Sequence, residues 1–246
     1  MQNKKLILNV YEDKLLKSKL SNQLLYGDNF KILKKLKKSY KIKSLYDGYL
    51  GYISKQKSNL QKNPTHKVSR LYAILYSRPN KSSKLKKKIS FGSLLIINKK
   101  KNKFYKFDKY WIKKDDIDPI NKKIKNFSNI KIFQNIRYKW GGNSYKGIDC
   151  SALVQIFFKY NRLYCPRDSK DQLVYFKNIR KSQEFNKNQL IFWKGHVAIC
   201  LNKKLLIHAY GPRKKVVIMN IKKTINEIKK KSNLSVIGRK RINVIR

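Results

Sequence analysis

Residues 138–158 read YKWGGNSYKGIDCSALVQIFF. This stretch is the most informative part of the sequence, because it predicts a loop followed by a helix that begins at a cysteine. Glycines and polar residues come first, as in a loop, and an apolar run broken only by Gln155 follows Cys150. The pattern predicts a buried helix over residues 150–160. A thiol at a helix N-terminus meets the positive end of the helix dipole and several free N–H groups, which favour the thiolate. Cys150 is therefore a candidate nucleophile.

Two histidines follow the cysteine, and both lie in strand patterns. His196 and His208 stand on either side of a polar tip at residues 202–204. Side chains alternate along a strand, so a hairpin would place both imidazoles on one face, opposite or diagonal. One could then act as base to the thiol while the other holds it in the right tautomer. Two His and a Cys could also bind zinc, but no paired-ligand motif supports this, so no metal is expected.

The composition predicts a folded chain with an unusual charge. Hydrophobic residues make up 41% of the 246 positions, and 61 Lys and Arg face 13 Asp and Glu, for a net charge of +48. Nucleic-acid binding, attraction to a polyanionic substrate and a coding bias toward lysine could each produce this excess. The lysines are scattered along the chain, which favours the bias. No obligatory nucleic-acid partner is therefore expected.

The same composition bears on location. No apolar stretch approaches the ~20 residues that a bilayer requires, so no membrane span is expected. The run at residues 6–8 is too short for a secretory signal peptide. Three cysteines do not suggest a disulfide framework, and Cys165 and Cys200 are expected in the core. A cytoplasmic location is the expectation, and export by an unrecognised route is the alternative.

The chain divides into two differently patterned halves. Short strand-like pieces and polar turns fill the first part, and Asp47-Gly48 is a hairpin dipeptide before an alternating aromatic strand. The spacing predicts small β-barrels at 1–58 and 66–117 with a linker between them. Residues 119–246 form the third domain, with helices near 120–135, at 150–160 and from Ser169, which could cap its helix. Strands near 189–210 follow, which predicts an α+β fold with an antiparallel sheet.

Five motifs in the second half act together. They are YKWGG at 138–142, GIDCS at 147–151, CPRDS at 165–169, FWKGHVAI at 192–199 and IHA at 207–209. In type, order and spacing they resemble the NlpC family of papain-like cysteine peptidases, bacterial enzymes that cut cell-wall peptides. LLYGD at 24–28 and DGYLGY at 47–52 resemble the bacterial SH3-type domains of members that release dipeptides from free muropeptides. The resemblance implies a papain-like domain preceded by two SH3-like barrels.

The resemblance also implies roles for individual residues. Cys150 corresponds to the nucleophile, His196 to the base, His208 to the orienting third member and Tyr138 to a residue that stabilises the oxyanion. Substrate-pocket positions correspond to Trp140, Asp149, Ser151, Asp168 and Ser169, with Tyr49 and Asp28 from the first barrel. The Asp168 carboxylate suits the free α-ammonium of an N-terminal L-alanine. Departures at Ala152, Gln189 and Asp28 remove no catalytic group.

The sequence therefore predicts a γ-D-glutamyl-L-diamino acid endopeptidase that acts on murein-derived peptides during their recycling. It would need no cofactor, and its substrates would carry a free N-terminal L-Ala. Two alternatives remain open. The chain could be a catalytically inactive module that binds the cell wall or a polyanion. It could instead be an amidase or acyltransferase on another substrate, because a fold does not fix a substrate.

Overall fold

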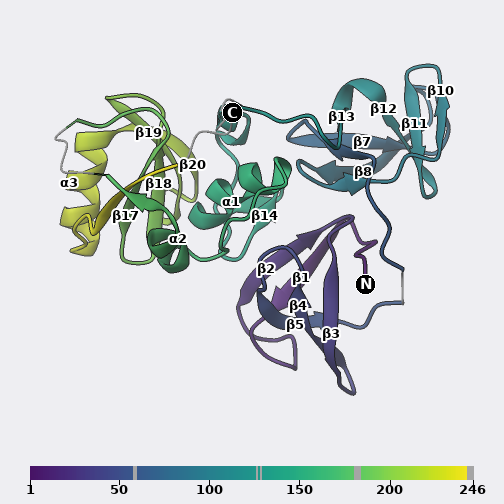
Figure 1. Ribbon diagram of the computed structural model, residues 1–246, viewed down its shortest axis with the longest axis horizontal. Helices are drawn as coiled ribbons and strands as arrows, with labels where there is room; N and C mark the ends of the chain where they lie inside the picture. Colours follow the sequence, from purple (N-terminus) through teal and green to yellow (C-terminus); the bar gives the residue numbers. More distant parts are fainter. Residues whose placement is uncertain (58–59, 126, 128, 180–183, 243–246) are drawn as a thin grey trace. The chain divides into compact units, whose positions relative to one another are not determined.

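The computed structural model describes residues 1–57, 60–125, 127, 129–179 and 184–242. Residues 58–59 of the expected linker and 243–246 of the expected third domain lie outside the described residues. The chain forms two compact units (Figure 1). Unit 1 comprises Met1–Lys123 and Gly141–Tyr145, and unit 2 comprises Ile124–Trp140 and Lys146–Arg246.

Unit 1 begins with a five-stranded sheet in the order β2-β1-β5-β4-β3. Its strands are β1 (Ile7–Tyr11), β2 (Leu20–Leu25), β3 (Phe30–Lys35), β4 (Ser39–Ser44) and β5 (Leu50–Ser54). Alternating apolar side chains bury one face, and this first core consists of Leu8, Val10, Leu24, Phe30, Ile42 and Ile53. Gly51 permits the close approach of β5 to β1, because a Cβ there would lie 2.4 Å from Val10 Cγ1.

The second sheet of unit 1 has the order β10-β11-β12-β7-β8, so β10 and β8 are its edge strands. Its strands are β7 (Tyr72–Tyr76), β8 (Lys84–Ser90), β10 (Lys99–Lys101), β11 (Phe104–Phe107) and β12 (Tyr110–Lys113). Both edges are rich in lysine: all three residues of β10 are exposed lysines, and β8 exposes Lys84, Lys86, Lys87 and Lys88. A smaller sheet joins β13 (Ile117–Pro119), β6 (His66–Val68) and β9 (Leu94–Leu95). The 3-10 turn η1 (Lys114–Asp116) directly precedes β13. Strand β14 (Asn143–Ser144) completes the unit.

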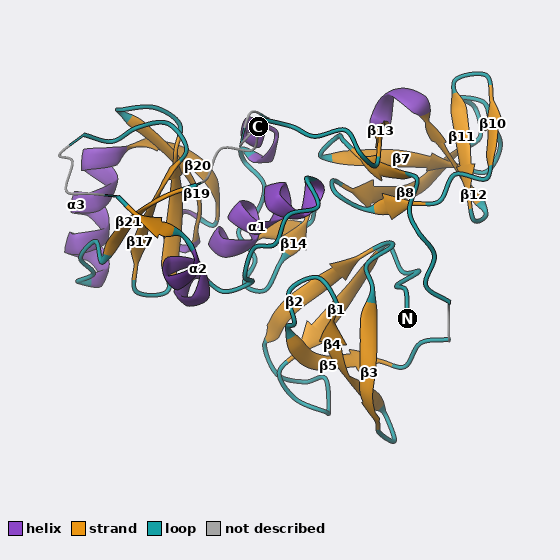
Figure 2. Ribbon diagram, in the orientation of Figure 1, coloured by secondary structure: helices purple, strands orange, loops and turns teal. Residues whose placement is uncertain are grey.

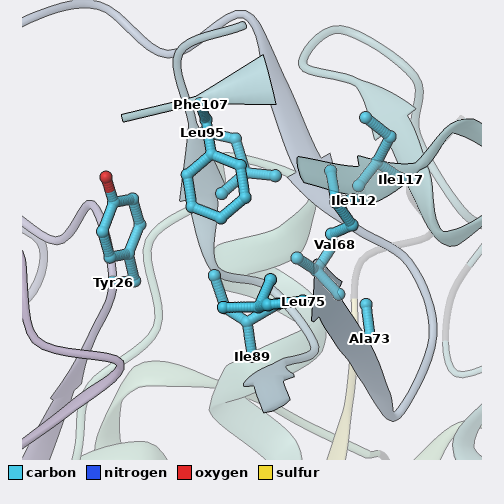
Figure 3. Close-up of a cluster of buried hydrophobic side chains, with 9 residues drawn as sticks. All are labelled: Tyr26, Val68, Ala73, Leu75, Ile89, Leu95, Phe107, Ile112 and Ile117. Carbon is cyan, nitrogen blue, oxygen red and sulfur yellow. The ribbon is translucent and has the colours of Figure 1, made fainter. Parts of the chain in front are cut away.

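The core of the second sheet contains one side chain from the first part of the chain. Tyr26, which follows β2, packs among the residues that Figure 3 labels: Val68, Ala73, Leu75, Ile89, Leu95, Phe107, Ile112 and Ile117. Its ring meets Phe107 edge-on at 5.3 Å between centroids. Its hydroxyl hydrogen bonds to Asp108, which also forms an ion pair of 3.3 Å with Lys4. The two sheets therefore share a core.

Unit 2 is built on a six-stranded antiparallel sheet in the order β16-β21-β17-β18-β19-β20. The strands are β16 (Lys177–Asn178), β17 (Gln189–Trp193), β18 (His196–Cys200), β19 (Leu205–Tyr210), β20 (Lys215–Asn220) and β21 (Gly238–Arg241), with β15 (Gly147–Ile148) apart from them. The helices are α1 (Cys150–Tyr160), α2 (Ser169–Tyr175) and α3 (Ile221–Ser232), with 3-10 turns η2 (Ile130–Phe133) and η3 (Gly211–Arg213). Figure 2 shows these α-helices (purple) beside the strands (orange) of unit 2.

Helices and antiparallel strands together make unit 2 an α+β fold, as the sequence predicts. Helix α1 is buried along its whole length, and it contacts β18 and β19. Helix α3 places Ile221 and Ile228 against Ile191, Leu206 and other apolar residues of the sheet. In the described part of the chain, no helix is long and apolar enough to cross a membrane.

The helix expected near 120–135 is wrong. The described residues of this segment form turns and the short η2 instead. The cause lies in Asn161, at the C-terminal cap of α1. Its side-chain amide accepts from the Ile124 N–H at 2.9 Å and donates to the Ile124 carbonyl at 2.9 Å. Both backbone groups of Ile124 are thus taken from helical bonding.

Candidate active site

Cys150 is the first residue of α1, as the apolar run after it predicts. Asp149 caps the helix, because its carboxylate accepts from the Ala152 N–H at 2.8 Å. The sulfur is buried, with Cys150 only 6% exposed. It lies 4.0 Å from the Gly195 carbonyl oxygen, and the N–H groups of Ser151 and Val197 hydrogen bond to it. The thiol therefore contacts the two neighbours of His196 in the turn into β18.

Thiol and imidazole are both neutral at rest. Burial, followed by the nearby Asp149 carboxylate, raises the pKa of Cys150 to about 12, in spite of the two N–H donors. Burial lowers the pKa of His196 to about 4. The thiolate favoured by the helix dipole is therefore not the resting form. Attack by sulfur requires that a base takes the proton, and a neutral imidazole can do so.

The hairpin of β18 and β19 brings the two histidines together. Ile199 pairs with Ile207, and this register sets His208 diagonally across from His196 on one face. His196 Nε2 lies 2.9 Å from His208 Nδ1, a hydrogen bond. Among the described residues, the His196 imidazole hydrogen bonds to His208 rather than to the sulfur. The other ring nitrogen of His196, Nδ1, takes no part in this bond.

His208 is enclosed on all sides. It is 0% exposed, and Tyr210 stacks on its ring with centroids 4.6 Å apart and an interplanar angle of 14°. Its second nitrogen, Nε2, lies 3.5 Å from the sulfur of Met219 on β20. Burial, then the His196 ring and Arg213, lower the pKa of His208 well below its usual value. The side chain is therefore neutral and fixed in orientation.

Tyr138 lies close enough to Cys150 for the two to interact electrostatically. Burial, then the Cys150 and Asp149 charges, raise the pKa of Tyr138, so the phenol keeps its proton. Its backbone N–H donates to the Lys214 carbonyl at 2.8 Å. The ring packs on Gly211, where an added Cβ would lie 3.6 Å from the Tyr138 ring. A protonated phenol near the thiol can donate to an oxyanion.

Two of the expected pocket residues are joined in a buried network with Arg167. The guanidinium donates to Asp149 at 2.6 and 3.1 Å and to the Ser151 hydroxyl at 2.9 Å. Arg167 is 3% exposed, so the ion pair is shielded from water. Gln172 of α2 donates to the Ser151 carbonyl at 3.0 Å and to that of Pro166 at 2.9 Å. The network fixes the first turn of α1, which carries the thiol.

Sequence reasoning missed Arg167 and Gln172 as parts of the site. The signal for Arg167 was present in CPRDS, where the arginine directly precedes Asp168. A buried arginine requires an anionic partner, and Asp149 was the available carboxylate in the neighbouring motif. Gln172 carried no such signal, because its contacts are to backbone carbonyls.

Asp168 and Ser169 lie at the start of α2. Asp168 occupies the N-cap position, so the expected cap at Ser169 is one residue late, and Ser169 is the first helical residue. The Asp168 side chain makes no capping hydrogen bond. Burial raises the pKa of Asp168, and the Arg167 charge opposes this shift. Trp140 is 58% exposed.

Asp28 and Tyr49 both belong to turns of unit 1. The Asp28 carboxylate accepts from the Leu25 N–H at 2.7 Å, and the residue is buried at 4% exposure. The Tyr49 N–H donates to the Asp47 carboxylate at 3.1 Å in the Asp47-Gly48 turn. The described residues contain no group of three or more His, Cys, Asp and Glu side chains that could hold a metal ion.

The chain resembles known proteins in sequence. The sequence profile of the NlpC/P60 family matches residues 135–233. The chain is 27% identical over 201 residues to the gamma-D-glutamyl-L-lysine dipeptidyl-peptidase of Bacillus subtilis (strain 168), covering 73% of this chain and 66% of that relative. It is 32% identical over 82 residues to the murein DD-endopeptidase MepS/murein LD-carboxypeptidase of Escherichia coli (strain K12), covering 31% and 44%. The matches thus span two thirds or less of these relatives' lengths.

The fold has a solved counterpart over most of the chain. An NlpC/P60 family protein from Bacillus cereus ATCC 10987 superposes with a TM-score of 0.76 at 24% identity, covering 90% of this chain and 82% of that one. The matched segment of this chain, residues 135–233, includes Cys150, His196 and His208. The part of this chain that carries the candidate site therefore matches the NlpC/P60 family.

Proposed function

We propose that this protein is a cysteine peptidase that hydrolyses cell-wall peptides at the γ-D-glutamyl–diamino acid bond. One observation carries the proposal: a buried thiol at the start of α1 contacts the residues that flank His196, whose imidazole is bonded to His208. The matched relatives, a gamma-D-glutamyl-L-lysine dipeptidyl-peptidase and a murein endopeptidase, support this substrate class.

The reaction follows from the protonation states. His196 takes the proton of the Cys150 thiol as sulfur attacks the γ-carbonyl carbon of the D-glutamyl residue. The resulting oxyanion accepts hydrogen bonds from backbone N–H groups around Cys150 and from the Tyr138 hydroxyl. The C–N bond then breaks, and the imidazolium gives its proton to the leaving amine. Water, deprotonated by His196, hydrolyses the thioester and restores the thiol.

The finer specificity is also part of the proposal. A half-buried Asp168 carboxylate that does not cap α2 is suited to an alkylammonium group. We assign it to the free N-terminal L-Ala of the substrate, so N-acetylation of the substrate should slow turnover. Several expectations remain predictions. They are the SH3-like character of 1–58 and 66–117, the domain limits, and a cytoplasmic place in peptide recycling. The roles of Trp140, Ser169, Tyr49 and Asp28 are predictions as well.

The test uses the full chain and L-Ala-γ-D-Glu-L-Lys, with the diaminopimelate tripeptide in parallel. Mass spectrometry should detect L-Ala-D-Glu and the free diamino acid. Cys150→Ala should abolish release, by at least ~1,000-fold, because the nucleophile is lost. Cys200→Ala is the matched control, since this buried cysteine lies in the sheet core.

Each other outcome selects an alternative. Full activity in Cys150→Ala would refute the thiol mechanism. Binding of peptide or sacculi without any product would identify an inactive binding module. Products of a different mass would identify an amidase or acyltransferase. A dipeptide released at equal rate from N-acetylated substrate would remove the role of Asp168.

A further inference from the structure

We propose that Met219 decides which ring nitrogen of His208 carries the proton, and through it which nitrogen of His196 is free to act as base. Met219 is thus a positioning residue, since it acts through two imidazoles. The inference rests on the proposed function only in taking His196 as the base. The protonation pattern itself is a property of the resting protein.

The geometry supplies a chain of three groups. Met219 Sδ lies 3.5 Å from His208 Nε2, and His208 Nδ1 lies 2.9 Å from His196 Nε2. Met219 pairs with Leu206 and Val217 pairs with His208, so the methionine stands diagonally beside the imidazole on the same face. The ring cannot turn easily, because it is fully buried and stacked on Tyr210.

The chemistry of sulfur determines which group donates and which accepts along these three side chains. A thioether has lone pairs and no hydrogen, so it can only accept. Burial keeps His208 neutral, with a single ring proton. If that proton sits on Nε2, it points at Met219, and Nδ1 accepts from His196 Nε2–H. The Nδ1 nitrogen of His196 then has a lone pair with which to accept the Cys150 proton.

The other tautomer is unfavourable and inactive. A proton on His208 Nδ1 would leave Nε2 of this fully buried ring bare, with its lone pair directed at the lone pairs of Met219. Buried polar atoms without a partner are disfavoured. His196 would accept at Nε2 and carry its own proton on Nδ1, so it could not take the thiol proton. The Met219 sulfur therefore favours the Nε2–H tautomer of His208 by making the Nδ1–H tautomer unfavourable.

The charged and titratable groups around His208 do not replace Met219. His196 and Arg213 both lower its pKa and keep the ring neutral. The Arg213 guanidinium forms an ion pair of 2.8 Å with Glu227. Tyr210 presents its ring face, in a stacked geometry, rather than its hydroxyl. Among the residues that the structure describes, Met219 is therefore the one recorded at hydrogen-bonding distance from Nε2.

The first test reads the tautomers directly and needs no substrate. The full chain has three histidines, so 15N labelling of the imidazoles gives few signals, and His66→Gln removes the one outside the site. Protonated and bare ring nitrogens have well-separated shifts. We expect His208 and His196 both protonated at Nε2 in the wild type. A proton on His208 Nδ1 would overturn the proposal even if the enzyme is active.

The second test uses variants of similar size. Met219→Leu removes the acceptor and leaves an Nε2–H without a partner, so the other tautomer should predominate; a competent fraction of about one tenth lowers kcat by about 10-fold at unchanged KM. Met219→Gln offers Nε2 both an acceptor oxygen and an amide donor, so it should permit both tautomers and give a kcat between those of Met219→Leu and wild type. Ile218→Leu, the neighbouring residue of β20, is the control for strand packing. Equal kcat in Met219→Leu and wild type would contradict the proposal.

The two tests separate the failures. If no peptide is cleaved but the NMR pattern is as expected, the proposed function fails and the tautomer assignment stands. If Met219→Leu loses kcat while its NMR pattern equals that of the wild type, the residue acts through packing and the proposal fails.

Discussion

Burial raises the pKa of the Cys150 thiol to about 12 and lowers the pKa of the His196 imidazole to about 4, which differs from the ion pair usually associated with activated cysteines. Proton transfer between them is unfavourable until a carbonyl carbon is available to the sulfur. Substrate binding and deprotonation are therefore coupled in this site.

At the same scale, Arg167 offers a sharp prediction. Arg167→Ala should lower the free energy of unfolding by about 3–5 kcal/mol, because the Asp149 carboxylate would be left buried without its cation. Urea denaturation followed by circular dichroism measures this loss. Arg213→Ala, which breaks an ion pair whose arginine is 48% exposed, should change stability far less than Arg167→Ala, because solvent screens an exposed pair. Similar losses in the two variants would show that the Arg167 pair is not structurally special.

The residue scale also shows what sequence can and cannot reveal. Cys150 stands out because it follows a loop and begins an apolar run, and the two histidines stand out because they lie in apolar strand patterns. Arg167 and Met219 do not, because their importance lies in partners that are distant in the sequence. Asp149 and Ser151 were expected toward the substrate, and the structure shows them bonded to Arg167. Their roles toward the substrate remain predictions.

Among the elements, the β18–β19 hairpin holds two imidazoles with lowered pKa values, His208 fully buried and His196 partly exposed, which predicts a pH-dependent stability. The folded pKa of His196 is about 4, below the ordinary value of about 6.5 for the unfolded chain. Between these values the unfolded chain binds a proton that the folded chain does not. Stability is therefore complete above pH 6.5 and decreases as the pH falls through 4, by about 3 kcal/mol from His196, with His208 adding in the same direction.

Chemical denaturation between pH 7.5 and pH 4 measures this dependence. The double variant His196→Gln/His208→Gln should show a flatter profile over the same range, whatever its absolute stability. A wild-type profile as flat as that of the double variant would contradict the assignment of neutral rings.

Helices and strands could be predicted where the residues of the segment itself determine its structure. Helix α1 is confirmed at 150–160, because its apolar face and Asp149 cap are both local. The helix near 120–135 failed, because the Asn161 side chain competes for the backbone of Ile124 from the far end of α1. Such a bond between distant residues leaves no periodic trace in the sequence.

For the whole molecule, Tyr26 follows β2 of the first sheet and packs in the core of the second sheet. We therefore expect the stabilities of the two sheets of unit 1 to be coupled. Tyr26→Ala should weaken the second core by about 3 kcal/mol, although residue 26 directly follows β2 of the first sheet. Hydrogen exchange should then be faster by about 100-fold or more in β7 and β12, with α1 unchanged. Tyr26→Phe keeps the packing and loses the bond to Asp108, so about 1 kcal/mol is expected.

Leu33→Ala is the matched control, since Leu33 lies on β3 and is 46% exposed. It should leave the exchange of β7 and β12 unchanged. Unaltered exchange in Tyr26→Ala would show that each sheet is stable without the shared side chain.

The lysines of β8 and β10 have one more consequence, for association between copies of the chain. These strands present the free hydrogen-bonding edges of the second sheet, where a strand from another molecule could add. Densely placed ammonium groups repel an equally basic neighbour before such pairing can form. Because that repulsion is screened within about 10 Å at ~0.1 M salt, concentrated salt or polyanionic counterions would remove the barrier, and ordered aggregation would then begin at these two edges.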